Sequence, residues 1–530
     1  MYIHSLSKTN MQKTILITGG AGFIGSNLCD FLIKQGHKVI CVDSFFSGKK
    51  ENIAHLLKSK NFRLIRHNII YPLKQNFDII DEIYHLACPA SPVQYQFDPV
   101  LTLRSGVDGT RNMLDLARKY DARLLFTSSS EVYGDPLEHP QTETYFGNVD
   151  PLGKRACYDE GKRAAESLCK DYHEQYGVDA RICRLFNVYG PRMMFNDGRV
   201  VSNFILQAIL NEDITIHGSG HQSRSFMYID DLLDGITKAM ALPHEDTGMR
   251  PFNLGNPDER TMEELAKEVK AAADSSSNIT YIDYDKIPSR WGDPQKRQPD
   301  ITRAKKILIW EPKVDLQEGL TKTINNFKSR LKNKTRIAVF APSYYPLEGP
   351  AEEALKQLAD ILIGYEFDLF VAKLKPGLAN YEKVGRVNVY RIGFGNKLDK
   401  YLLPLIAPFK AAKLHKRKDY QAAWGIMASY GSLAAAAFSW LTRRALMVSM
   451  YEGKFDETAS VKSRLLKPFY KVILKKAHYL QVVGELTQSQ LAWLEDDKHI
   501  EGVDLEKGWD YVSKKTKEKL QELEILSSRL

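Results

Sequence analysis

The chain alternates short apolar runs with longer stretches in which apolar residues recur every three or four positions. The short runs predict buried strands, and the periodic stretches predict helices with one buried face. Alternation of this kind favours an α/β fold class, a doubly wound parallel sheet of the Rossmann type. In the first half the predicted strands are 14–18, 38–42, 82–86, 124–128 and 180–184, and the predicted helices are 26–35, 107–120 and 159–176.

A second α/β pattern follows a lysine-rich segment at 327–334. It opens with a strand at 336–340, a Pro/Tyr/Gly loop at 341–349 and a helix at 350–362 that has proline in its first turn. Further strands are predicted near 368–371, 387–392, 445–448 and 479–483. Because 530 residues exceed one hydrophobic core, we predict three parts: a tail at 1–12, a first domain at 13–330, and a second Rossmann-like domain at 335–530.

Composition and cysteine spacing predict the cellular compartment of the protein. With 43% hydrophobic and 26% charged residues the chain can bury large cores, and it has neither a signal peptide nor a charge-free apolar run of about 20 residues. The six cysteines lack C-x-x-C spacing, which predicts reduced thiols without a metal site. We therefore expect a cytoplasmic protein that binds no nucleic acid.

Positive charge gathers in the second half. The formal net charge is +9, and from Thr335 onward 30 Lys and Arg face 23 Asp and Glu. Such a half could face an anionic ligand, a membrane surface or only solvent. The segment 401–418 is apolar first and basic last, which fits either an interfacial helix too short to span a bilayer or a core helix with a basic end.

A glycine-rich turn joins the first predicted strand to its helix. Gly19 allows the tight turn, Gly22 lets a pyrophosphate approach the backbone, and Gly25 lets the helix pack on its strand. Asp43 ends the second strand 18 residues beyond Gly25, where an acid binds the adenosine ribose. The arrangement predicts a dinucleotide site that prefers NAD to NADP.

Candidate catalytic side chains follow the strand at 124–128. Ser129, Ser130 and Glu131 stand at its carboxyl end, where open α/β sheets place their chemistry. Tyr158 and Lys162 are four residues apart on a predicted helix, so the ammonium should lower the pKa of the phenol and make it a base. The alternatives are serines that only cap a turn and a Tyr/Lys pair on a solvated helix face.

Arginines then recur in less regular sequence, at Arg192, Arg199, Arg224 and Arg297. Guanidinium groups spread over loops after a sheet suit a diphosphate ligand. Each could also be an independent surface charge.

The first 330 residues or so resemble the extended short-chain dehydrogenase/reductase superfamily, and within it the UDP-glucuronate decarboxylases. The resemblance rests on seven motifs: 19–25 with Asp43, H-L-A-C-P-A-S-P at 85–92, T-S-S-S-E-V-Y-G at 127–134, R-A-C-Y-D-E-G-K at 155–162, R-L-F-N at 184–187 with G-P-R at 190–192, N-D-G-R-V-V-S-N-F at 196–204, and R-Q-P-D at 297–300.

The resemblance implies NAD, a UDP-glucuronate substrate, a homodimer and a small substrate-binding subdomain within the first domain, with these residue roles. Tyr158 would be the base, Lys162 its partner and Ser129 a ligand of the sugar oxygen, while Ser130, Glu131 and Arg297 would act at C5 and the carboxylate. NAD would contact Gly19, Gly22, Phe23, Ile24, Gly25, Asp43, Asn68, Ile69, Leu86, Ala87, Tyr158 and Lys162. The UDP-sugar would contact Pro89, Asn187, Arg192, Val200, Phe204, Arg224 and Arg297.

Three residues depart from the family pattern: Gly106 replaces an Asn near the active site, Asn68 an Asp at adenine, and His217 an aromatic near uridine. Two alternative functions stay open, and Gly106 is the feature that supports the second of them. One is a nucleotide-sugar 4-epimerase or 4,6-dehydratase, and the other is a non-catalytic scaffold that binds NAD and UDP-sugar and recruits a glycosyltransferase partner.

The second half resembles the N-terminal Rossmann-like domain of GT-B glycosyltransferases of the family-4 type. The similarity lies in the strand at 336–340, the loop Y-P-L-E-G-P at 345–350 and G-V-D at 502–504. It implies that the donor-binding half is missing, and that this domain binds an acceptor or a glycosyltransferase partner.

Overall fold

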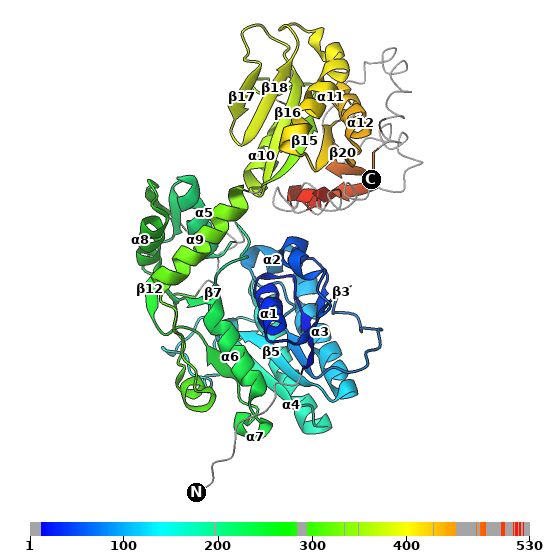
Figure 1. Cartoon of the computed structure of the whole chain (residues 1–530). Helices are drawn as coiled ribbons and strands as arrows, with labels where there is room; N and C mark the ends of the chain where they lie inside the picture. The colour runs from blue at the N-terminus through cyan, green and yellow to red at the C-terminus, as the bar shows by residue number, and fades with distance from the viewer. Residues whose placement is uncertain are drawn as a thin grey trace. The chain divides into compact units, whose positions relative to one another are not determined.

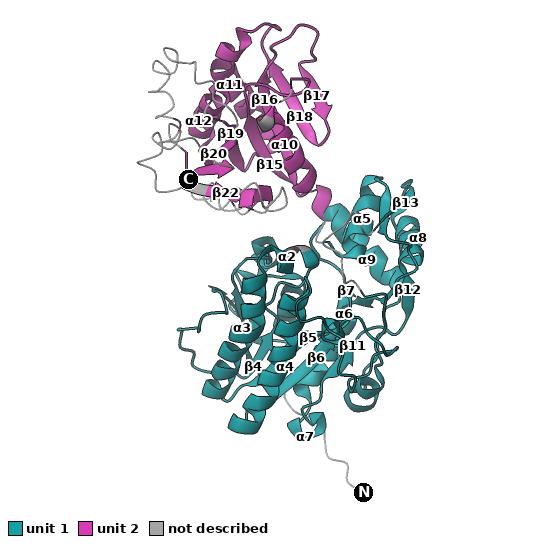
Figure 2. Cartoon of the chain, turned by 180° about the vertical axis from the view of Figure 1, so that it is seen from behind, with its two compact units in different colours: residues 1–329 teal, residues 330–530 magenta. Residues whose placement is uncertain are grey.

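The computed structural model describes residues 12–195, 198–283, 294–332, 334–347, 349–427, 429–451, 473, 477–483, 500–503, 512, 513, 515–517, 519, 520 and 523. Several predictions fall partly outside these residues, namely the tail apart from Gln12, and Asn196, Asp197, Glu348 and Asp504 of the family motifs. The chain divides into two compact units, Met1–Ser329 (unit 1) and Arg330–Leu530 (unit 2), which Figure 2 colours separately.

A seven-stranded parallel sheet organises unit 1, which confirms the predicted α/β fold class. Its order, β11-β6-β5-β4-β1-β2-β3, reverses direction between β1 and β4, because the chain runs outward from β1 to β3 and then returns to β1's other side. In such sheets ligands bind at this reversal, beyond the carboxyl ends of the strands. The strands are β1 (Thr14–Thr18), β2 (Lys38–Asp43), β3 (Phe62–Arg66), β4 (Glu82–His85), β5 (Arg123–Ser129), β6 (Ala180–Leu185) and β11 (Phe252–Leu254).

Helices cover both faces of this sheet (Figures 1 and 2). On one face α1 (Phe23–Lys34) and α6 (Ile229–Ala241) contribute Leu28, Leu32 and Ile236 to the largest core. On the other face α3 (Pro99–Tyr120) and α4 (Ala156–Tyr176) contribute Met113 and Ala165 to a second core. Because apolar cores cover both faces of the sheet, polar side chains that act on a ligand are expected at the ends of the strands.

A smaller subdomain stands beyond the carboxyl ends of the strands. Three small sheets build it, pairing β7 (Val188–Tyr189) with β10 (Met227–Tyr228), β8 (Ile214–His217) with β13 (Ile279–Ile282), and β9 (Ser223–Ser225) with both β12 (Glu259–Thr261) and β14 (Lys296–Arg297). The helices of unit 1 not yet placed are α2 (Pro92–Phe97), α5 (Val200–Leu210), α7 (His244–Thr247), α8 (Met262–Ala273) and α9 (Leu316–Lys332).

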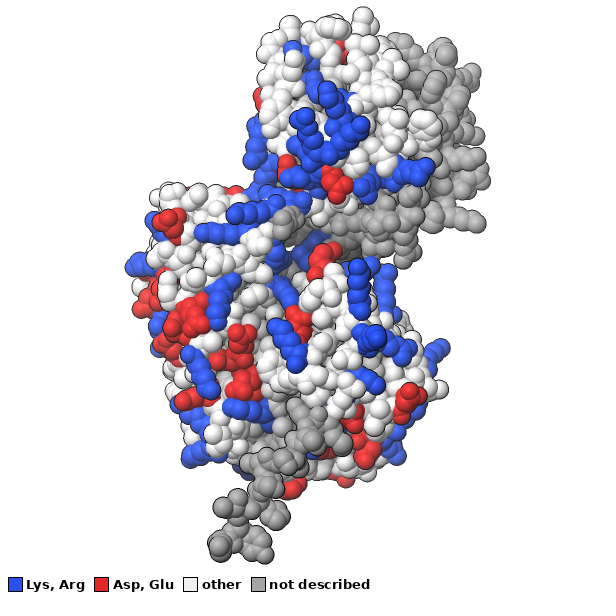
Figure 3. Space-filling model, in the orientation of Figure 1, with Lys and Arg blue, Asp and Glu red and all other residues white. Residues whose placement is uncertain are grey.

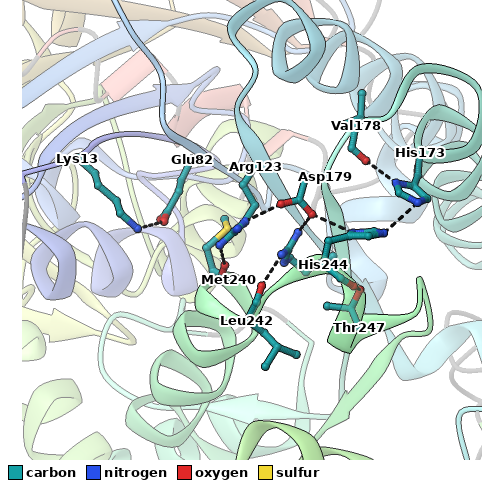
Figure 4. A network of polar contacts seen from close by, with 11 residues as sticks. Lys13, Glu82, Arg123, His173, Val178, Asp179, Met240, Leu242, His244 and Thr247 are labelled. Atoms are coloured by element: carbon teal, nitrogen blue, oxygen red, sulfur yellow. Dashed lines mark hydrogen bonds and ion pairs between the residues drawn. The ribbon is translucent and has the colours of Figure 1, made fainter. Parts of the chain in front are cut away.

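The opposite, amino-terminal end of the sheet is closed by a polar network (Figure 4). Asp179, just before β6, accepts hydrogen bonds from Arg123 Nε at 2.8 Å and His244 Nδ1 at 3.0 Å, and it also pairs with Arg181. His244 Nε2 lies 2.9 Å from His173 Nε2 at the end of α4. The network joins α4, α7 and two strands far from the predicted chemistry, so its role is structural.

Unit 2 is a second sandwich of helices on a largely parallel sheet, with only β17 antiparallel among its described strands. The order is β17-β18-β16-β15-β19-β20-β21-β22, with bounds Thr335–Phe340 (β15), Tyr365–Ala372 (β16), Tyr381–Val384 (β17), Val387–Ile392 (β18), Ala422–Ile426 (β19), Leu446–Tyr451 (β20), Tyr479–Val483 (β21) and Ile500–Val503 (β22). Helix α10 (Pro350–Ile361) packs on one face, and α11 (Asp399–Lys418) and α12 (Tyr430–Thr442) pack on the other.

Predicted strands lie where the apolar runs placed them, but several helices begin earlier. Helix α3 starts at Pro99 rather than 107, because Asp98 caps it by accepting a 2.9 Å hydrogen bond from Leu101 N. The lysine-rich segment 327–334, whose sequence lacks apolar periodicity after Phe327, predicts an exit from the first domain, and the boundary between the two units falls within it, after Ser329. The segment begins inside a helix, since α9 continues to Lys332 and buries Phe327.

Candidate active site

The glycine turn after β1 is shaped so that only glycine fits at two of its positions. A Cβ on Gly25 would lie 2.2 Å from the carbonyl oxygen of Gly19, and Gly19 itself has φ +69°. Gly19 also faces the end of β4, where its Cβ would be 3.1 Å from Ala87 Cα. The turn therefore sits at the reversal between β1 and β4, where a pyrophosphate can reach backbone N–H groups.

Asp43 at the end of β2 holds this turn in place. Its carboxylate accepts hydrogen bonds from Ala21 N at 2.9 Å and Phe45 N at 2.7 Å. Burial raises the pKa of Asp43, and these two backbone hydrogen bonds oppose the rise. The Asp43 carboxylate is thus fixed beside the glycine turn, and its contact with the ribose of a dinucleotide stays a prediction.

The other predicted NAD contacts line the same end of the sheet. Leu86 N and Ala87 N each donate to Thr18 Oγ1 at 3.1 Å, which ties β4 to β1. Asn68 accepts from Ile70 N at 3.2 Å, and Ile69 O accepts from Asn112 on α3 at 2.9 Å. Phe23 and Ile24 form the first turn of α1.

The predicted catalytic side chains come together beyond β5. Ser129 ends the strand and its hydroxyl accepts from Glu131 N at 3.3 Å, while Ser130 and Glu131 open a short 3₁₀ turn. Tyr158 on α4 hydrogen-bonds Ser129 and is buried. The Tyr158 ring stacks on Tyr95 of α2, with centroids 5.3 Å apart and planes 15° from parallel.

The electrostatics of Tyr158 differ from the expectation. Burial raises the pKa of Tyr158 above its ordinary value, and the hydrogen bond with Ser129 opposes the rise without cancelling it. Lys162 was expected to lower this pKa, but its Nζ donates to Thr127 O at 2.7 Å and lies 5.7 Å from the Tyr158 ring centroid. Burial also lowers the pKa of Lys162, which weakens its hold on a phenolate in this state.

Glu131 is the centre of a buried ion-pair network. Both of its carboxylate oxygens accept from the Arg297 guanidinium, one at 3.0 Å, and Arg155 of the segment before α4 adds a further bond. Burial raises the pKa of Glu131, but the two arginines outweigh it and hold the pKa well below its usual range. Glu131 is therefore a carboxylate, and Arg297 reaches it through the pairing of β14 with β9.

Arg155, Tyr95 and Asp159 are neighbours of this site that sequence reasoning did not assign. Arg155 and Asp159 lie inside the motif at 155–162, yet nothing in their spacing names their partners. Asp159 is 5% exposed, and its Oδ1 finds no hydrogen-bond partner within the described chain. Burial, and then the Glu131 charge, raise the pKa of Asp159 to about 8.

The predicted nucleotide contacts are spread over the subdomain, and several are engaged with protein groups. Arg192 pairs with Asp30 of α1, and Arg224 donates to the carbonyls of Ser223 and Pro294. Asn187 Nδ2 donates to Ser225 O at 3.3 Å. Among the remaining predicted contacts, Pro89 is buried, Val200 begins α5, and Phe204 is buried in the core.

The structure leaves no open space for a side chain at Gly106. On α3 it faces α4, where a Cβ at Gly106 would lie 2.7 Å from the carbonyl oxygen of Gly161.

Within the described residues there is no cluster of three or more His, Cys, Asp and Glu arranged for a metal ion. Nor does any described helix combine the length and hydropathy needed to cross a bilayer.

Comparison with known proteins fits this geometry. The sequence model of the NAD dependent epimerase/dehydratase family matches residues 15–255. The chain is 53% identical over 320 residues to UDP-glucuronic acid decarboxylase 1 of Arabidopsis thaliana, covering 60% of this chain and 71% of the relative. It is 50% identical over 323 residues to UDP-glucuronic acid decarboxylase 1 of Danio rerio, covering 61% and 74%.

Solved structures give the same picture for unit 1. The UDP-glucose 4-epimerase of Thermotoga maritima, solved with UDP-glucose, is 30% identical with a TM-score of 0.53. The UDP-glucuronic acid 4-epimerase of Bacillus cereus, solved with UDP-glucuronic acid and NAD, is 27% identical with a TM-score of 0.52. Each similarity covers 60% of this chain and 99% of the solved chain.

Proposed function

Since this chain belongs to the NAD-dependent epimerase/dehydratase family, we propose that unit 1 removes the C6 carboxylate of UDP-glucuronate as CO2 and yields UDP-xylose. NAD is the cofactor of the family and fits the residues present, because the glycine turn at Gly19 and Gly25 leaves no room for Cβ atoms and Asp43 stands beside it. NAD would accept a hydride from C4 of the sugar and later return it.

The order of bond changes follows from the substrate. The carboxylate of UDP-glucuronate is beta to C4, so a C4 ketone makes a β-keto acid whose carbon–carbon bond breaks to give CO2 and a delocalised enolate. A solvent proton then joins C5, and the C4 ketone is reduced again. The net reaction consumes one proton and releases one CO2, and the cofactor is unchanged.

Tyr158 is the proposed base at the C4 hydroxyl. Its hydrogen bond with Ser129 keeps the two hydroxyl groups next to each other at the end of β5, so Ser129 can bind the same sugar oxygen. Burial raises the pKa of Tyr158, which opposes formation of the phenolate. For the phenolate to form, the Lys162 ammonium must stabilise it, either by leaving the Thr127 carbonyl or by interacting with both groups at once. Lys162 would also bind the nicotinamide ribose.

The observation that carries the proposal is the bidentate pairing of Arg297 with Glu131 beside this base. A guanidinium at the C5 end of the sugar can bind the departing carboxylate of the substrate. When the CO2 has left, the Glu131 carboxylate can pair with that guanidinium again. Ser130, buried in the same turn, completes this end of the site. Asn187, Arg192, Val200, Phe204 and Arg224 are the proposed UDP contacts, with Pro89 next to the sugar.

For unit 2 we propose a glycosyltransferase-like domain that binds an acceptor or a partner, supported by its loop at 345–350 after the first strand. For unit 1 we propose a homodimer through α3 and α4, supported by Val100 and Leu103, which are exposed apolar residues on α3. A cytoplasmic setting is supported by the six cysteines, all of which are free.

The test is CO2 release from UDP-glucuronate by the full chain and by Tyr158→Phe. We expect the variant to lose at least about 10²-fold in rate while calorimetry shows unchanged NAD binding. Release at the wild-type rate would remove Tyr158 as the base. A 4-epimerase or 4,6-dehydratase would convert its substrate with no loss of carbon at all.

A further inference from the structure

Helix α11 of unit 2 carries apolar side chains on two separate faces. One face, formed by Leu403, Ala407 and Ala411 at intervals of four, is buried in the core against the sheet. A second stripe, also spaced by three or four residues, is exposed. Its members are Leu398, Tyr401, Leu405 and Phe409, of which Leu405 and Phe409 are each 65% exposed.

The loop before α11 extends this stripe. Phe394 is 83% exposed and lies between two glycines with positive φ, Gly393 at +114° and Gly395 at +98°. Asp399 holds the loop, since its buried carboxylate accepts from Gly395 N at 2.6 Å and Asn396 N at 3.1 Å. Phe394 is therefore held outward by a fixed backbone. We call Phe394, Leu398, Tyr401, Leu405 and Phe409 the α11 apolar surface.

Cations border this surface at both ends. The segment 394–418 contains seven Lys and Arg against one acid, Asp399, which is buried in the loop just described. Lys397 precedes the helix, and Lys413, Lys416 and Arg417 follow the apolar stripe with exposed side chains. Figure 3 shows Lys and Arg gathered on the viewed face of unit 2, with few acidic side chains among them.

We propose that the α11 apolar surface binds the interface of an anionic phospholipid membrane, with the helix lying parallel to the bilayer plane. A contiguous exposed apolar patch on a soluble domain marks an interaction site. Helices that lie in a membrane interface bury an apolar stripe below the headgroups and place lysines beside anionic lipids. Helix α11 meets both conditions, and like the other described helices it is too polar to cross the bilayer.

The charge of the α11 apolar surface and its borders disfavours two other binding partners, a second copy of this chain and another protein. A second copy of this surface would bring the cations of two helices together, which is repulsive, because the exposed acid at the end of α11, Asp419, is already paired with Arg444. A protein partner would need an apolar groove rimmed by acids. An anionic bilayer supplies both an apolar interior and a continuous negative surface, so it matches the whole length of the segment.

The test is sedimentation of the full chain with vesicles of phosphatidylcholine alone and of phosphatidylcholine mixed with phosphatidylglycerol. We expect binding to the anionic vesicles only. Leu405→Ser/Phe409→Ser should weaken it at least about tenfold, because two apolar side chains no longer enter the bilayer. Lys413→Gln/Lys416→Gln should weaken it about tenfold as well, and added salt should mimic that change.

The matched control is Ile79→Ser/Ile309→Ser, which removes two exposed apolar side chains from unit 1 and should leave vesicle binding unchanged. Decarboxylation by every variant should equal that of the wild type, which shows that unit 1 is folded, and a circular dichroism spectrum and urea unfolding curve equal to those of the wild type show the same for unit 2. The proposal is overturned if the wild type binds no vesicle, or if Leu405→Ser/Phe409→Ser binds anionic vesicles as well as the wild type does. Loss of self-association in that variant, without any lipid binding by the wild type, would assign the surface to a protein contact instead.

Discussion

Gly106 of α3 lies directly against the backbone of Gly161 in α4: a Cβ on Gly106 would be 2.7 Å from the carbonyl oxygen of Gly161. Side-chain carbons essentially never approach a backbone oxygen so closely. The departure from the family pattern at residue 106 is therefore a packing feature of the two helices. It brings α4, and with it Tyr158, close to α3.

Gly106→Asn should consequently destabilise the protein and not restore a missing catalytic group. We expect a loss of about 2 kcal/mol in the free energy of unfolding, since overpacking costs about 1–3 kcal/mol and the gain in helix propensity is under about 1 kcal/mol. Urea unfolding measures this. Asp108→Asn is the control on the same helix, because its side chain is partly exposed. A variant more stable and more active than the wild type would contradict the packing argument.

Glu131→Gln should lower the rate of CO2 release by about 10²–10³-fold. The amide cannot neutralise Arg155 and Arg297, whose side chains are only 11% and 3% exposed. Leaving them without a counter-charge should also cost about 3 kcal/mol of stability, so rates are to be compared where circular dichroism shows both proteins folded. Glu138→Gln, at an exposed site, should change neither quantity. Unchanged CO2 release by Glu131→Gln would remove Glu131 from the reaction.

Arg184 and Glu166 form a second, largely buried pair behind the site, with side chains 12% and 14% exposed. Two guanidinium nitrogens donate to the two carboxylate oxygens at 2.9 and 2.7 Å, and a third bond joins Arg184 to Tyr133. Glu166→Gln should lower the free energy of unfolding by about 3 kcal/mol because it breaks a buried pair. The exposed pair of Glu160 with Arg163 is the comparison, and Glu160→Gln should cost under about 0.5 kcal/mol. Equal losses in the two variants would contradict this assignment.

Asp159 should make stability depend on pH. The folded protein raises the pKa of Asp159 to about 8 from 3.8, so the fold favours its protonated form. The contribution of Asp159 is fully present below the lower pKa and is lost as pH rises toward the upper one, by up to about 1.4 kcal/mol per pH unit. Asp159→Asn cannot titrate, so it should gain stability relative to the wild type between about pH 5 and about pH 8. Urea unfolding at both pH values tests this, and parallel behaviour of the two proteins would contradict it.

The fold was largely predictable because burial leaves a periodic trace in the sequence. Strands β1, β18 and β21 have the predicted bounds, since each is a short run rich in Val, Ile, Leu and Tyr that glycine follows in the sequence. The order of the strands was not predictable, because hydrogen bonding between strands has no local signature. Helix starts were missed where one side chain, such as Asp98, caps a turn that has no apolar period.

The candidate site was predictable as a set of residues but not as a network. Glu131 and Arg297 are 166 residues apart, and only the pairing of β14 with β9 brings the guanidinium to the carboxylate. The pKa of Tyr158 was predicted from the Lys162 spacing alone. Burial, and the choice of Thr127 as the partner of Lys162, depend on the packing of the whole unit.

The most direct test of the account is the NMR spectrum of the product that purified full-length protein forms from UDP-glucuronate in deuterated water. We expect UDP-xylose with one deuteron at C5, because the enolate takes its proton from solvent. The C4 position should keep its original hydrogen, because the hydride that leaves C4 returns to it. Unreacted substrate, a C4 epimer that retains the carboxylate, or a product with deuterium at C4 would contradict decarboxylation by reversible oxidation at C4.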